Sequence, residues 1–313
     1  IETVSALSLP GLLNVTVAIA PSRLIKIPLF IGIPGNVEFR NPQDPRRITS
    51  RTIMSRFISA AGILQCAEQT TAALHGASAM TATATIAHTI GICMFDLYGT
   101  VVDMQGGLTR AAAPYLKAKG WAGDPSRLVT WWRRTHFENS MIDALLGRAH
   151  TPYREIGRIS LAYTLERAGV PHTQEEVKSL VAEIERLQPF PDAVAALARL
   201  KKKYRLVILS NGDPDMLEAI QPHLGIAFDR MISVAEAGSF KPHAATYRRA
   251  AEIMGARAEA ILFVANHAFD CVGAKASGMR AAFVDRRKRP FGDWPYQPDL
   301  VVGNLAELAD LLG

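Results

Sequence analysis

The sequence predicts an α/β protein with a doubly wound parallel sheet and an all-helical cap domain inserted after the first strand. From residue 90 onward, short apolar runs alternate with amphipathic helical patterns, which is typical of a parallel sheet with crossover helices. One long interval, 106–189, interrupts this alternation and contains helical patterns without a convincing strand. At 313 residues the chain is long enough to bury one large core or two modest ones.

The predicted elements follow one another in a regular order. The apolar runs predicted as strands are 92–95, 205–209, 230–234, 261–265 and 281–284. The periodic stretches predicted as helices are 192–203, 214–223, 244–254 and 270–276. We therefore predict a core made of residues 89–105 and 190–313 and a cap made of residues 106–189, with Pro189 and Pro191 marking the return to the core.

Residues 1–88 differ from the rest of the chain. Acidic residues are sparse there, Pro, Ser, Thr and Ala are frequent, and neither helix nor strand periodicity persists. We expect an N-terminal extension that is poorly ordered. The Arg- and Ser-rich segment 46–56 is also typical of an organellar transit peptide, and that alternative stays open.

The basic residues are scattered, although the formal net charge is +6. The tightest basic runs are 201–203, at the end of a predicted helix, and 286–289, in a predicted surface turn. Neither run alternates with aromatic residues as a base-stacking surface does, so we interpret both as solvated charge and predict no nucleic-acid binding. The apolar stretch 11–35 is interrupted by Pro21, Arg23 and Lys26, so we predict no membrane association.

The cysteines are odd in number and widely spaced. Cys66, Cys93 and Cys271 form no CxxC pair, which argues against a disulfide framework or a structural zinc site. Cys93 lies inside a predicted core strand, where a free thiol behaves as a small apolar group. This usage predicts a reducing, cytoplasmic location.

Polar side chains recur where the predicted strands end. They are Asp96 after 92–95, Ser210 and Asn211 after 205–209, Lys241 in the loop 238–242, and Asn266, His267 and Asp270 after 261–265. Each has an ordinary local explanation, since Asp96 or a Ser-Asn-Gly stretch can form a turn and Asp270 can cap a helix. Ligands bind outside the carboxyl ends of strands in open α/β sheets, so the features together predict an active site.

The order Asp96, Ser210, Lys241 and Asp270 resembles the haloacid dehalogenase superfamily, over residues 90–312. Within it, the chain looks like the type II (S)-2-haloacid dehalogenases. The residues that carry this likeness are FDLYGT at 95–100, Trp132-Arg133 in the cap, ILSNG at 208–212, Lys241-Pro242 with Tyr247, and ILFV at 261–264. The resemblance implies a Rossmann-like core, hydrolysis of short (S)-2-haloacids to 2-hydroxy acids with inversion at C2, no cofactor, and a homodimer.

Tyr98 separates two branches of that superfamily. Superfamily phosphatases typically carry a second Asp two positions after the nucleophile, which protonates an alcohol leaving group and helps to hold magnesium. Tyr98 occupies this position, and a phenol with a pKa near 10 is a poor replacement for that acid. A departing halide needs no proton. The residue therefore favours dehalogenation over phosphoryl transfer, and we expect no metal.

The resemblance also implies roles for individual residues. Asp96 is the nucleophile that forms an aspartyl ester, and Lys241 lowers its pKa. Ser210, with main-chain donors around Leu97 and Tyr98, holds the substrate carboxylate. The other roles implied are support of Asp96 and Lys241 by Thr100 and Tyr247, and contact with the departing halide by Arg133 and Asn211.

Arg133 and the aromatic residues of the predicted cap can each be interpreted in two ways. Arg133 can instead form a surface ion pair with Glu138, one turn further along the helix. Trp131, Trp132 and Phe137 supply a dry wall for the alkyl group or simply pack within the cap.

The last motif departs from the family. The family usually has Ser-Ser-Asn-x-x-Asp, whereas this chain has Ala265-Asn266-His267 followed by Asp270. The first hydroxyl is lost and the matching Asn is His267, at positions that place or activate the hydrolytic water. His267 can take the proton of that water or can be a structural histidine, and Asp270 can be the base or can orient Lys241.

Two rival functions remain at this point. One is a superfamily phosphatase or other phosphoryl-transfer hydrolase, which Tyr98 argues against. The other is a catalytically weak binding protein with the same fold, which the altered last motif favours and the retained Asp96, Lys241 and Asp270 oppose.

Overall fold

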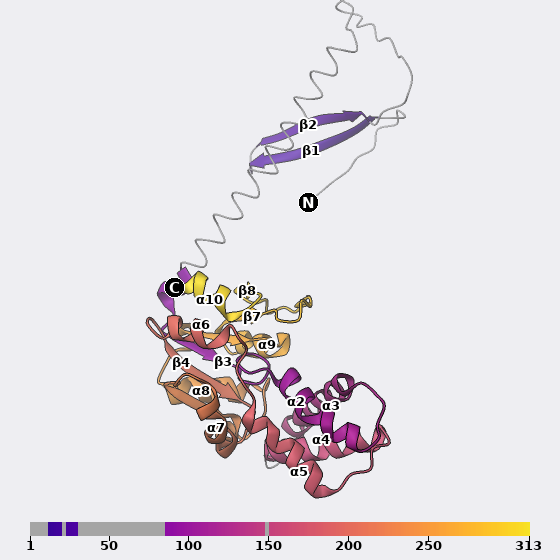
Figure 1. Ribbon diagram of the computed structural model, residues 1–313. Coiled ribbons are helices and arrows are strands. Elements are labelled where there is room, and N and C mark those ends of the chain that lie inside the picture. The colour runs from indigo at the N-terminus through magenta and orange to yellow at the C-terminus, as the bar shows by residue number, and fades with distance from the viewer. Residues whose placement is uncertain (1–11, 21–22, 31–84, 148–149) are drawn as a thin grey trace, which may run out of the picture. The chain divides into compact units, whose positions relative to one another are not determined.

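The computed structural model describes residues 12–20, 23–30, 85–147 and 150–313, in two compact units that we treat separately (Figure 1). The first unit contains an antiparallel pair, β1 (Leu12–Ala20) and β2 (Arg23–Phe30), with Leu12 opposite Phe30. The sequence analysis predicted no strand here. Four of the nine residues of β1 are β-branched, but only two of the eight in β2 are. The ladder depends on the pairing of the two segments, which no periodicity within either one reveals. The prediction of a poorly ordered extension, and Cys66, otherwise lie outside the described residues.

The second unit is built on a six-stranded parallel sheet of order β5-β4-β3-β6-β7-β8. The strands are β3 (Ile92–Phe95), β4 (Arg205–Ser210), β5 (Arg230–Ser233), β6 (Ile261–Ala265), β7 (Arg280–Val284) and β8 (Leu300–Val302). Strand β3 pairs with β4 on one side and with β6 on the other. The predicted doubly wound parallel sheet is confirmed, and β3 lies at the point where the strand order reverses, which is where α/β proteins bind ligands.

The core strands are apolar because both faces of the sheet are covered. Every residue of β3 and β6 is buried, which matches the continuous apolar runs that predicted them. The other predicted boundaries agree to within one residue for β4, β5 and β7. Strand β8 was not predicted, since three residues with Val301 exposed give no recognisable pattern.

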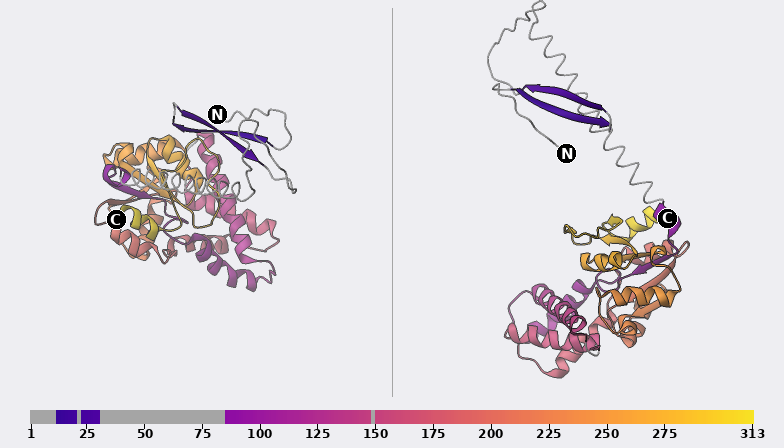
Figure 2. Two further views of the ribbon diagram at one scale, coloured as in Figure 1. Left: turned by 90° about the horizontal axis from the view of Figure 1, so that it is seen from above. Right: turned by 180° about the vertical axis from the view of Figure 1, so that it is seen from behind.

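Helices cover the sheet on both faces (Figure 2). They are α6 (Ala193–Leu200), α7 (Pro214–Ile220), α8 (Ala244–Met254), α9 (Ala268–Ala276) and α10 (Leu305–Leu312), with the short 3₁₀ turns η2 (Gln221–His223), η3 (Val234–Ala237) and η4 (Ala258–Ala260). The crossovers through α6 and α8 run in opposite directions across the sheet, so right-handed connections place these helices on opposite faces. The α10 helix packs beside α6, and α9 beside α8.

The segment between β3 and α6 is helical in its described part. It contains α2 (Met104–Ala118), α3 (Pro125–Leu146), α4 (Tyr153–Arg167), α5 (Gln174–Ala182) and η1 (Glu183–Arg186), and no strand is present among residues 104–147 and 150–188. Figures 1 and 2 show these helices gathered at the end of the sheet toward which β3 points. The division into cap and core at 106 and 189 stays a prediction.

Local sequence signals set the ends of these helices. Asp124 accepts a hydrogen bond from the N–H of Ser126 and caps α3, which begins at Pro125. Thr173 and Glu176 form a reciprocal capping box on α5. The carboxylate of Asp213, which follows β4, accepts from the backbone N–H groups of Tyr153 and Arg154 at 2.7 and 3.0 Å. This last contact ties the start of α4 to the core near the carboxyl end of β4.

Two further predictions bear on the described residues. Cys93 is a free, buried thiol, as predicted for a residue of a core strand, and Cys271 is also free and buried. No helix in the described parts of the chain is long and apolar enough to cross a membrane.

Candidate active site

Asp96 lies directly after β3, and the loop that follows brings a glycine and a threonine against it. The backbone N–H of Asp96 continues the sheet by donating to the carbonyl oxygen of Val264 at 3.0 Å. Gly99 has a φ of 94°, in the left-handed region that favours glycine. A Cβ there would also lie 3.3 Å from Cε1 of His267 and 3.4 Å from Nη2 of Arg133. The turn therefore needs glycine for its backbone and for the two side chains that approach it.

A single buried cation joins two carboxylates. Nζ of Lys241 lies 2.8 Å from Oδ1 of Asp96 and 2.7 Å from Oδ2 of Asp270, and it also donates to the carbonyl oxygen of Leu209 at 3.0 Å. Its side chain is 2% exposed, and that of Asp270 is 1% exposed. The ammonium thus uses its three donors on three buried oxygen atoms, which fixes its position.

The shared lysine affects the two acids differently. Burial raises the pKa of Asp96, but Lys241 and the facing His267 outweigh it, so the pKa lies well below its usual range. Burial raises the pKa of Asp270 to about 6, against the opposing effect of Lys241. The charges of both carboxylates overcome burial and raise the pKa of Lys241. Asp96 is therefore ionised across the ordinary pH range, and Asp270 is an acid that titrates near pH 6.

Thr100 and Tyr247 lie where the sequence analysis expected supporting residues. Oγ1 of Thr100 donates to Oδ2 of Asp96 at 2.7 Å and accepts from the backbone N–H of Asn266 at 2.9 Å. The hydroxyl of Tyr247, on α8, donates to Oδ1 of Asp270 at 2.5 Å. Each acid therefore has one oxygen on Lys241 and the other on a hydroxyl. The Asp96 carboxylate binds Lys241 and Thr100, so a local turn does not account for this residue. Asp270 does not cap α9 either, because the N-cap residue of that helix is His267.

Hydrogen-bond donors without partners lie in the loop after β3 and at the end of the neighbouring strand β4. Ser210 is fully buried and its Oγ accepts from the N–H of Gly212 at 3.1 Å, which leaves its own hydrogen free to donate. Within the described structure, the backbone N–H groups of Leu97 and Tyr98 make no hydrogen bond. Oδ1 of Asn211 accepts from the backbone N–H of Lys241 at 3.1 Å, which ties this loop to the lysine. Free N–H and O–H donors beside a carboxylate suit an anionic ligand such as another carboxylate.

Tyr98 contributes a ring. Its ring stacks on that of Tyr153, with centroids 5.9 Å apart and planes 5° apart. Its hydroxyl is buried and has no hydrogen-bond partner among the described residues. Burial raises the pKa of Tyr98 well above its ordinary value, with smaller contributions from Tyr153 and nearby acids. The group therefore stays protonated and cannot act as an acid for a leaving group.

Arg133 brings a positive charge from α3 to the site. Its Nη1 donates to Oε1 of Gln105 at 2.9 Å, and its Nη2 faces Gly99. Its Nε is buried and has no partner within the described residues. Burial and the charge of Arg287 lower the pKa of Arg133 to about 10, which still leaves it charged. The surface ion pair with Glu138 is not present in the described structure, and the unpaired guanidinium suits a small anion.

His267 lies between Asp96 and an arginine that the sequence analysis did not select. Its Nδ1 is 3.8 Å from Oδ2 of Asp96, and its Nε2 is 2.8 Å from Nη2 of Arg287. Nε of Arg287 donates to Oδ1 of Asn266 at 3.1 Å, and Asn266 donates in turn to the carbonyl oxygen of Val284 at 2.8 Å. The loop after β7 therefore supplies part of the site.

The interpretation of the run 286–289 as solvated charge is wrong for Arg286, and it omits the contacts that the exposed Arg287 makes. The guanidinium of Arg286 forms two hydrogen bonds with Asp192, at 2.9 and 3.0 Å, and its Nε donates to the carbonyl oxygen of Thr100. Arg287, Lys288 and Arg289 are all exposed, and the guanidinium of Arg287 nevertheless contacts Asn266 and His267. A run of like charges reveals nothing about which members find partners, because those partners come from other strands.

The aromatic residues of α3 separate into two roles. Trp132 is 1% exposed and donates to the carbonyl oxygen of Gly157 at 3.2 Å, so it packs α3 against α4. Trp131 is largely exposed. Phe137 packs on Phe269, with ring centroids 4.2 Å apart, and Phe269 lies beside His267. Of the three, Phe137 is the one that reaches a neighbour of the site. Sequence reasoning missed Tyr153 and Gln105, which carry no motif.

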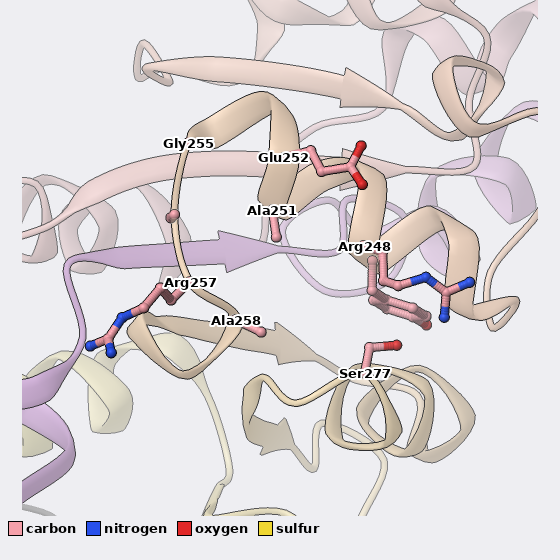
Figure 3. A pocket seen from close by; sticks show the side chains of 9 residues that line it. Arg248, Ala251, Glu252, Gly255, Arg257, Ala258 and Ser277 are labelled. Atoms are coloured by element: carbon pink, nitrogen blue, oxygen red, sulfur yellow. The ribbon is translucent and has the colours of Figure 1, made fainter.

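A separate hollow of about 410 Å³ is lined by residues of α8, by the segment that follows α8 and by Ser277 at the end of α9 (Figure 3). Its lining includes Arg248, Glu252, Arg257 and Ser277, together with Tyr247. Asp96, Lys241 and Asp270 do not line it, so it is distinct from the catalytic residues described above.

No group of three or more His, Cys, Asp and Glu side chains able to hold a metal ion occurs in residues 85–147 and 150–313 or in β1 and β2. Neither this nor the lack of bound groups tests the expectation that no cofactor is used, which stays a prediction.

Comparison with known proteins finds relatives over the part of the chain that contains Asp96, Lys241 and Asp270. A family model described as haloacid dehalogenase-like hydrolase matches residues 90–278. An (S)-2-haloacid dehalogenase of Xanthobacter autotrophicus is 34% identical over 217 residues, which are 69% of this chain and 81% of that protein. The structure of L-2-haloacid dehalogenase from Xanthobacter autotrophicus aligns with a TM-score of 0.64 at 31% identity, over 71% of this chain and 98% of that one. A second structure of that enzyme, with chloropropionic acid covalently bound, aligns with a TM-score of 0.63, at the same identity and coverage.

Proposed function

The chain belongs to the haloacid dehalogenase-like hydrolases, and on that premise we propose that it hydrolyses short (S)-2-haloacids to 2-hydroxy acids through an ester on Asp96. The observation that carries the proposal is the ionised, buried Asp96, held by Lys241 at 2.8 Å and by Thr100 at 2.7 Å, with Tyr98 two residues later. The covalent adduct of chloropropionic acid in a structure 31% identical to this chain supports an ester intermediate.

The first step is displacement of the halide. A carboxylate oxygen of Asp96 attacks C2 of the substrate, the carbon–halogen bond breaks, and the halide leaves with both bonding electrons. In-line attack inverts the configuration at C2. The free donors of Leu97, Tyr98 and Ser210 suit the substrate carboxylate, and the partly unpaired guanidinium of Arg133 suits the departing halide. The stacked rings of Tyr98 and Tyr153 supply an apolar wall.

The second step is hydrolysis of the ester. Water attacks Cγ of Asp96, the bond from Cγ to the ester oxygen breaks, and the 2-hydroxy acid leaves. One proton of the water ends on the product hydroxyl, and we assign the other to Asp270. A pKa raised to about 6 makes Asp270 a better base near neutral pH than an ordinary aspartate. Lys241 holds the two acids together throughout.

Phosphoryl transfer has less support at this site. It needs an acid that protonates an alkoxide and usually a third carboxylate for a metal. Tyr98 stands at the position of that acid, and its hydroxyl is buried with a raised pKa.

The homodimer and the cytoplasmic location also stay proposals. Apolar side chains are exposed on two adjacent cap helices, namely Ile142, Leu145 and Leu146 on α3 and Ile159 and Tyr163 on α4. Such a patch suits an interface between two copies of the chain. Light scattering at micromolar concentration tests this, and a mass near 34.1 kDa would contradict it.

The decisive experiment measures halide release from (S)-2-chloropropionate with EDTA present. We expect the natural chain to release chloride and form (R)-lactate, and Asp96→Asn to release none. The (R)-enantiomer is the matched control substrate and should be inert. Phosphate release from a phosphomonoester that depends on magnesium would indicate the phosphatase. Tight substrate binding without any chloride would indicate the binding protein.

A further inference from the structure

Arg287 contacts two residues of the altered last motif at once. Its Nη2 lies 2.8 Å from Nε2 of His267, and its Nε lies 3.1 Å from Oδ1 of Asn266. Asn266 is itself fixed, since its side chain donates to Val284 and its backbone N–H donates to Thr100. The guanidinium is therefore bound to a rigid partner on one edge and to the imidazole on the other.

This contact decides where the proton of His267 resides. A guanidinium has only donors, so Nε2 of His267 must accept. A neutral imidazole that accepts at Nε2 carries its proton on Nδ1. Nδ1 is the atom that faces Oδ2 of Asp96, at 3.8 Å. The imidazole thus presents an N–H, and no lone pair, to the nucleophile.

The charges around His267 favour its neutral form. Three charged groups face it, namely Asp96 from the end of β3, Arg133 from α3 and Arg287 from the loop after β7. Burial and the two arginines lower the pKa of His267, and Asp96 opposes them without reversing the direction. The neighbour on α9 is the ring of Phe269, whose centroid lies 5.3 Å away and brings no charge.

We propose that Arg287 is a positioning residue that keeps His267 neutral with its Nδ1–H directed at Asp96, so that His267 acts as a hydrogen-bond donor and not as the base for water. At 3.8 Å from Oδ2 in the free site, the N–H is beyond direct hydrogen-bond range and stays available for the ester. It can donate to negative charge that develops on an Asp96 oxygen when water attacks Cγ. This role in ester hydrolysis rests on the proposed function, but the protonation state of His267 can be tested without turnover.

The first test is NMR of the chain labelled with ¹⁵N-histidine, with the His267 signals assigned by their loss in His267→Asn. We expect the neutral Nδ1–H tautomer in the natural chain at pH 7, and protonation of His267 only at a pH below that of an ordinary histidine. In Arg287→Met, we expect the signals of His267 to titrate at a higher pH than in the natural chain, because one of the charges that lower its pKa is gone. Arg289→Met removes the same charge from an exposed neighbour and should leave the tautomer unchanged. An Nε2–H tautomer, or an imidazolium at pH 7, in the natural chain would overturn the proposal whether or not the protein is a dehalogenase.

The second test compares variants in single turnovers that follow halide release and ester hydrolysis separately. His267→Asn keeps an amide donor but cannot accept a proton near neutral pH, so we expect ester hydrolysis to slow by less than tenfold. His267→Leu removes the donor, and we expect a loss of about a hundredfold, in the range found for one oxyanion donor. If both variants accumulate the ester to the same extent, the donor role is wrong and a base role is supported.

The third test uses the pH profile of Arg287→Met. Between pH 7.5 and 5.5 its rate relative to the natural chain should fall several-fold, because without Arg287 the pKa of His267 is higher and the ring becomes cationic at a higher pH than in the natural chain. The ratio should stay constant for Arg289→Met and for the double variant Arg287→Met, His267→Asn. A constant ratio for Arg287→Met alone would show that Arg287 acts only in folding. If the natural chain releases no halide at all, the proposed function fails and the NMR result still stands by itself.

Discussion

Nζ of Lys241 lies 2.8 Å from Oδ1 of Asp96, although 145 positions of sequence separate the two residues. The same ammonium lies 2.7 Å from Asp270, so one positive charge serves two buried carboxylates. The unequal pKa values of the two acids follow from this sharing, since Asp96 remains ionised and the charge that it carries helps to raise the pKa of Asp270. We therefore assign the nucleophile to Asp96 and the base to Asp270. Such a division of roles is found in other sites where the environment separates the pKa values of two carboxylates.

Replacement of this lysine should abolish both chemistry and much of the stability. In Lys241→Met, Asp96 and Asp270 lose their counter-charge while they remain buried, which we expect to cost about 3–5 kcal/mol of unfolding free energy. The pKa values of both acids then rise above their unfolded values. The folded state binds the extra protons at low pH, so the loss of stability should grow as pH rises from 4 to 8. Thermal unfolding at pH 4.5 and 7.5 measures this, and an equal loss at the two pH values would contradict it.

The two chemical steps should depend differently on pH. Asp270 accepts a proton only when it is ionised. Burial raises its pKa above the ordinary value, and this cause persists in the ester, where the charge of Asp96 is gone, so ester hydrolysis should slow as the pH falls toward 5. Asp96 has a lowered pKa and should still attack at pH 5. We expect a burst of halide equal to the enzyme concentration at pH 5, followed by a slow steady rate. Rapid-quench measurement of halide checks this, and loss of the burst itself at pH 5 would show that Asp96 is protonated.

Tyr247→Phe should shift the loss of ester hydrolysis at low pH to a higher pH. The Tyr247 hydroxyl donates to Oδ1 of Asp270 and lowers its pKa, so removal of the hydroxyl lets the pKa rise. We expect an upward shift of about one pH unit, with the rate above pH 8 nearly unchanged. A uniform loss of rate at every pH would instead indicate that Tyr247 only packs.

Tyr98→Phe should change the rate of halide release very little. The hydroxyl is buried and has no partner within the described structure, so its removal leaves no group unsatisfied and should raise stability by up to about 1 kcal/mol. Halide release should stay within about threefold of the natural rate, because the ring that stacks on Tyr153 is retained. A tenfold fall in kcat/KM would mean that the hydroxyl contacts the substrate.

Arg133→Met should impair departure of the halide more than hydrolysis of the ester. The guanidinium faces Gly99 with a buried Nε that has no partner among the described residues, and a developing halide charge would satisfy it. We expect the rate of the halide burst to fall by about a hundredfold, while hydrolysis of preformed ester changes little. Arg134→Met, at the next position on α3, is the control. An equal effect on both steps would assign Arg133 to the binding of substrate in general.

The comparison of sequence with structure shows where local pattern is enough. Strand β3 and the acid after it follow from one apolar run and the residue that ends it, and so do β6 and its polar ending. Two features of the structure were not predicted, for the same reason. The β1–β2 pair depends on a partner segment, and the contacts of Arg286 and Arg287 depend on groups from other elements, 20 residues away in the case of His267.

The sequence by itself determined that the polar residues after β3, β4 and β6 lie near one another, because the carboxyl ends of parallel strands meet at one edge of a sheet. It also determined that Tyr98 replaces an acid. Only the tertiary structure decided how those groups share their hydrogen bonds: that Lys241 bridges Asp96 and Asp270, and that Arg287 directs the proton of His267 toward the nucleophile. The physical reason is that a side chain's charge and proton depend on partners within about 3 Å, and those partners come from strands and loops that no local pattern connects.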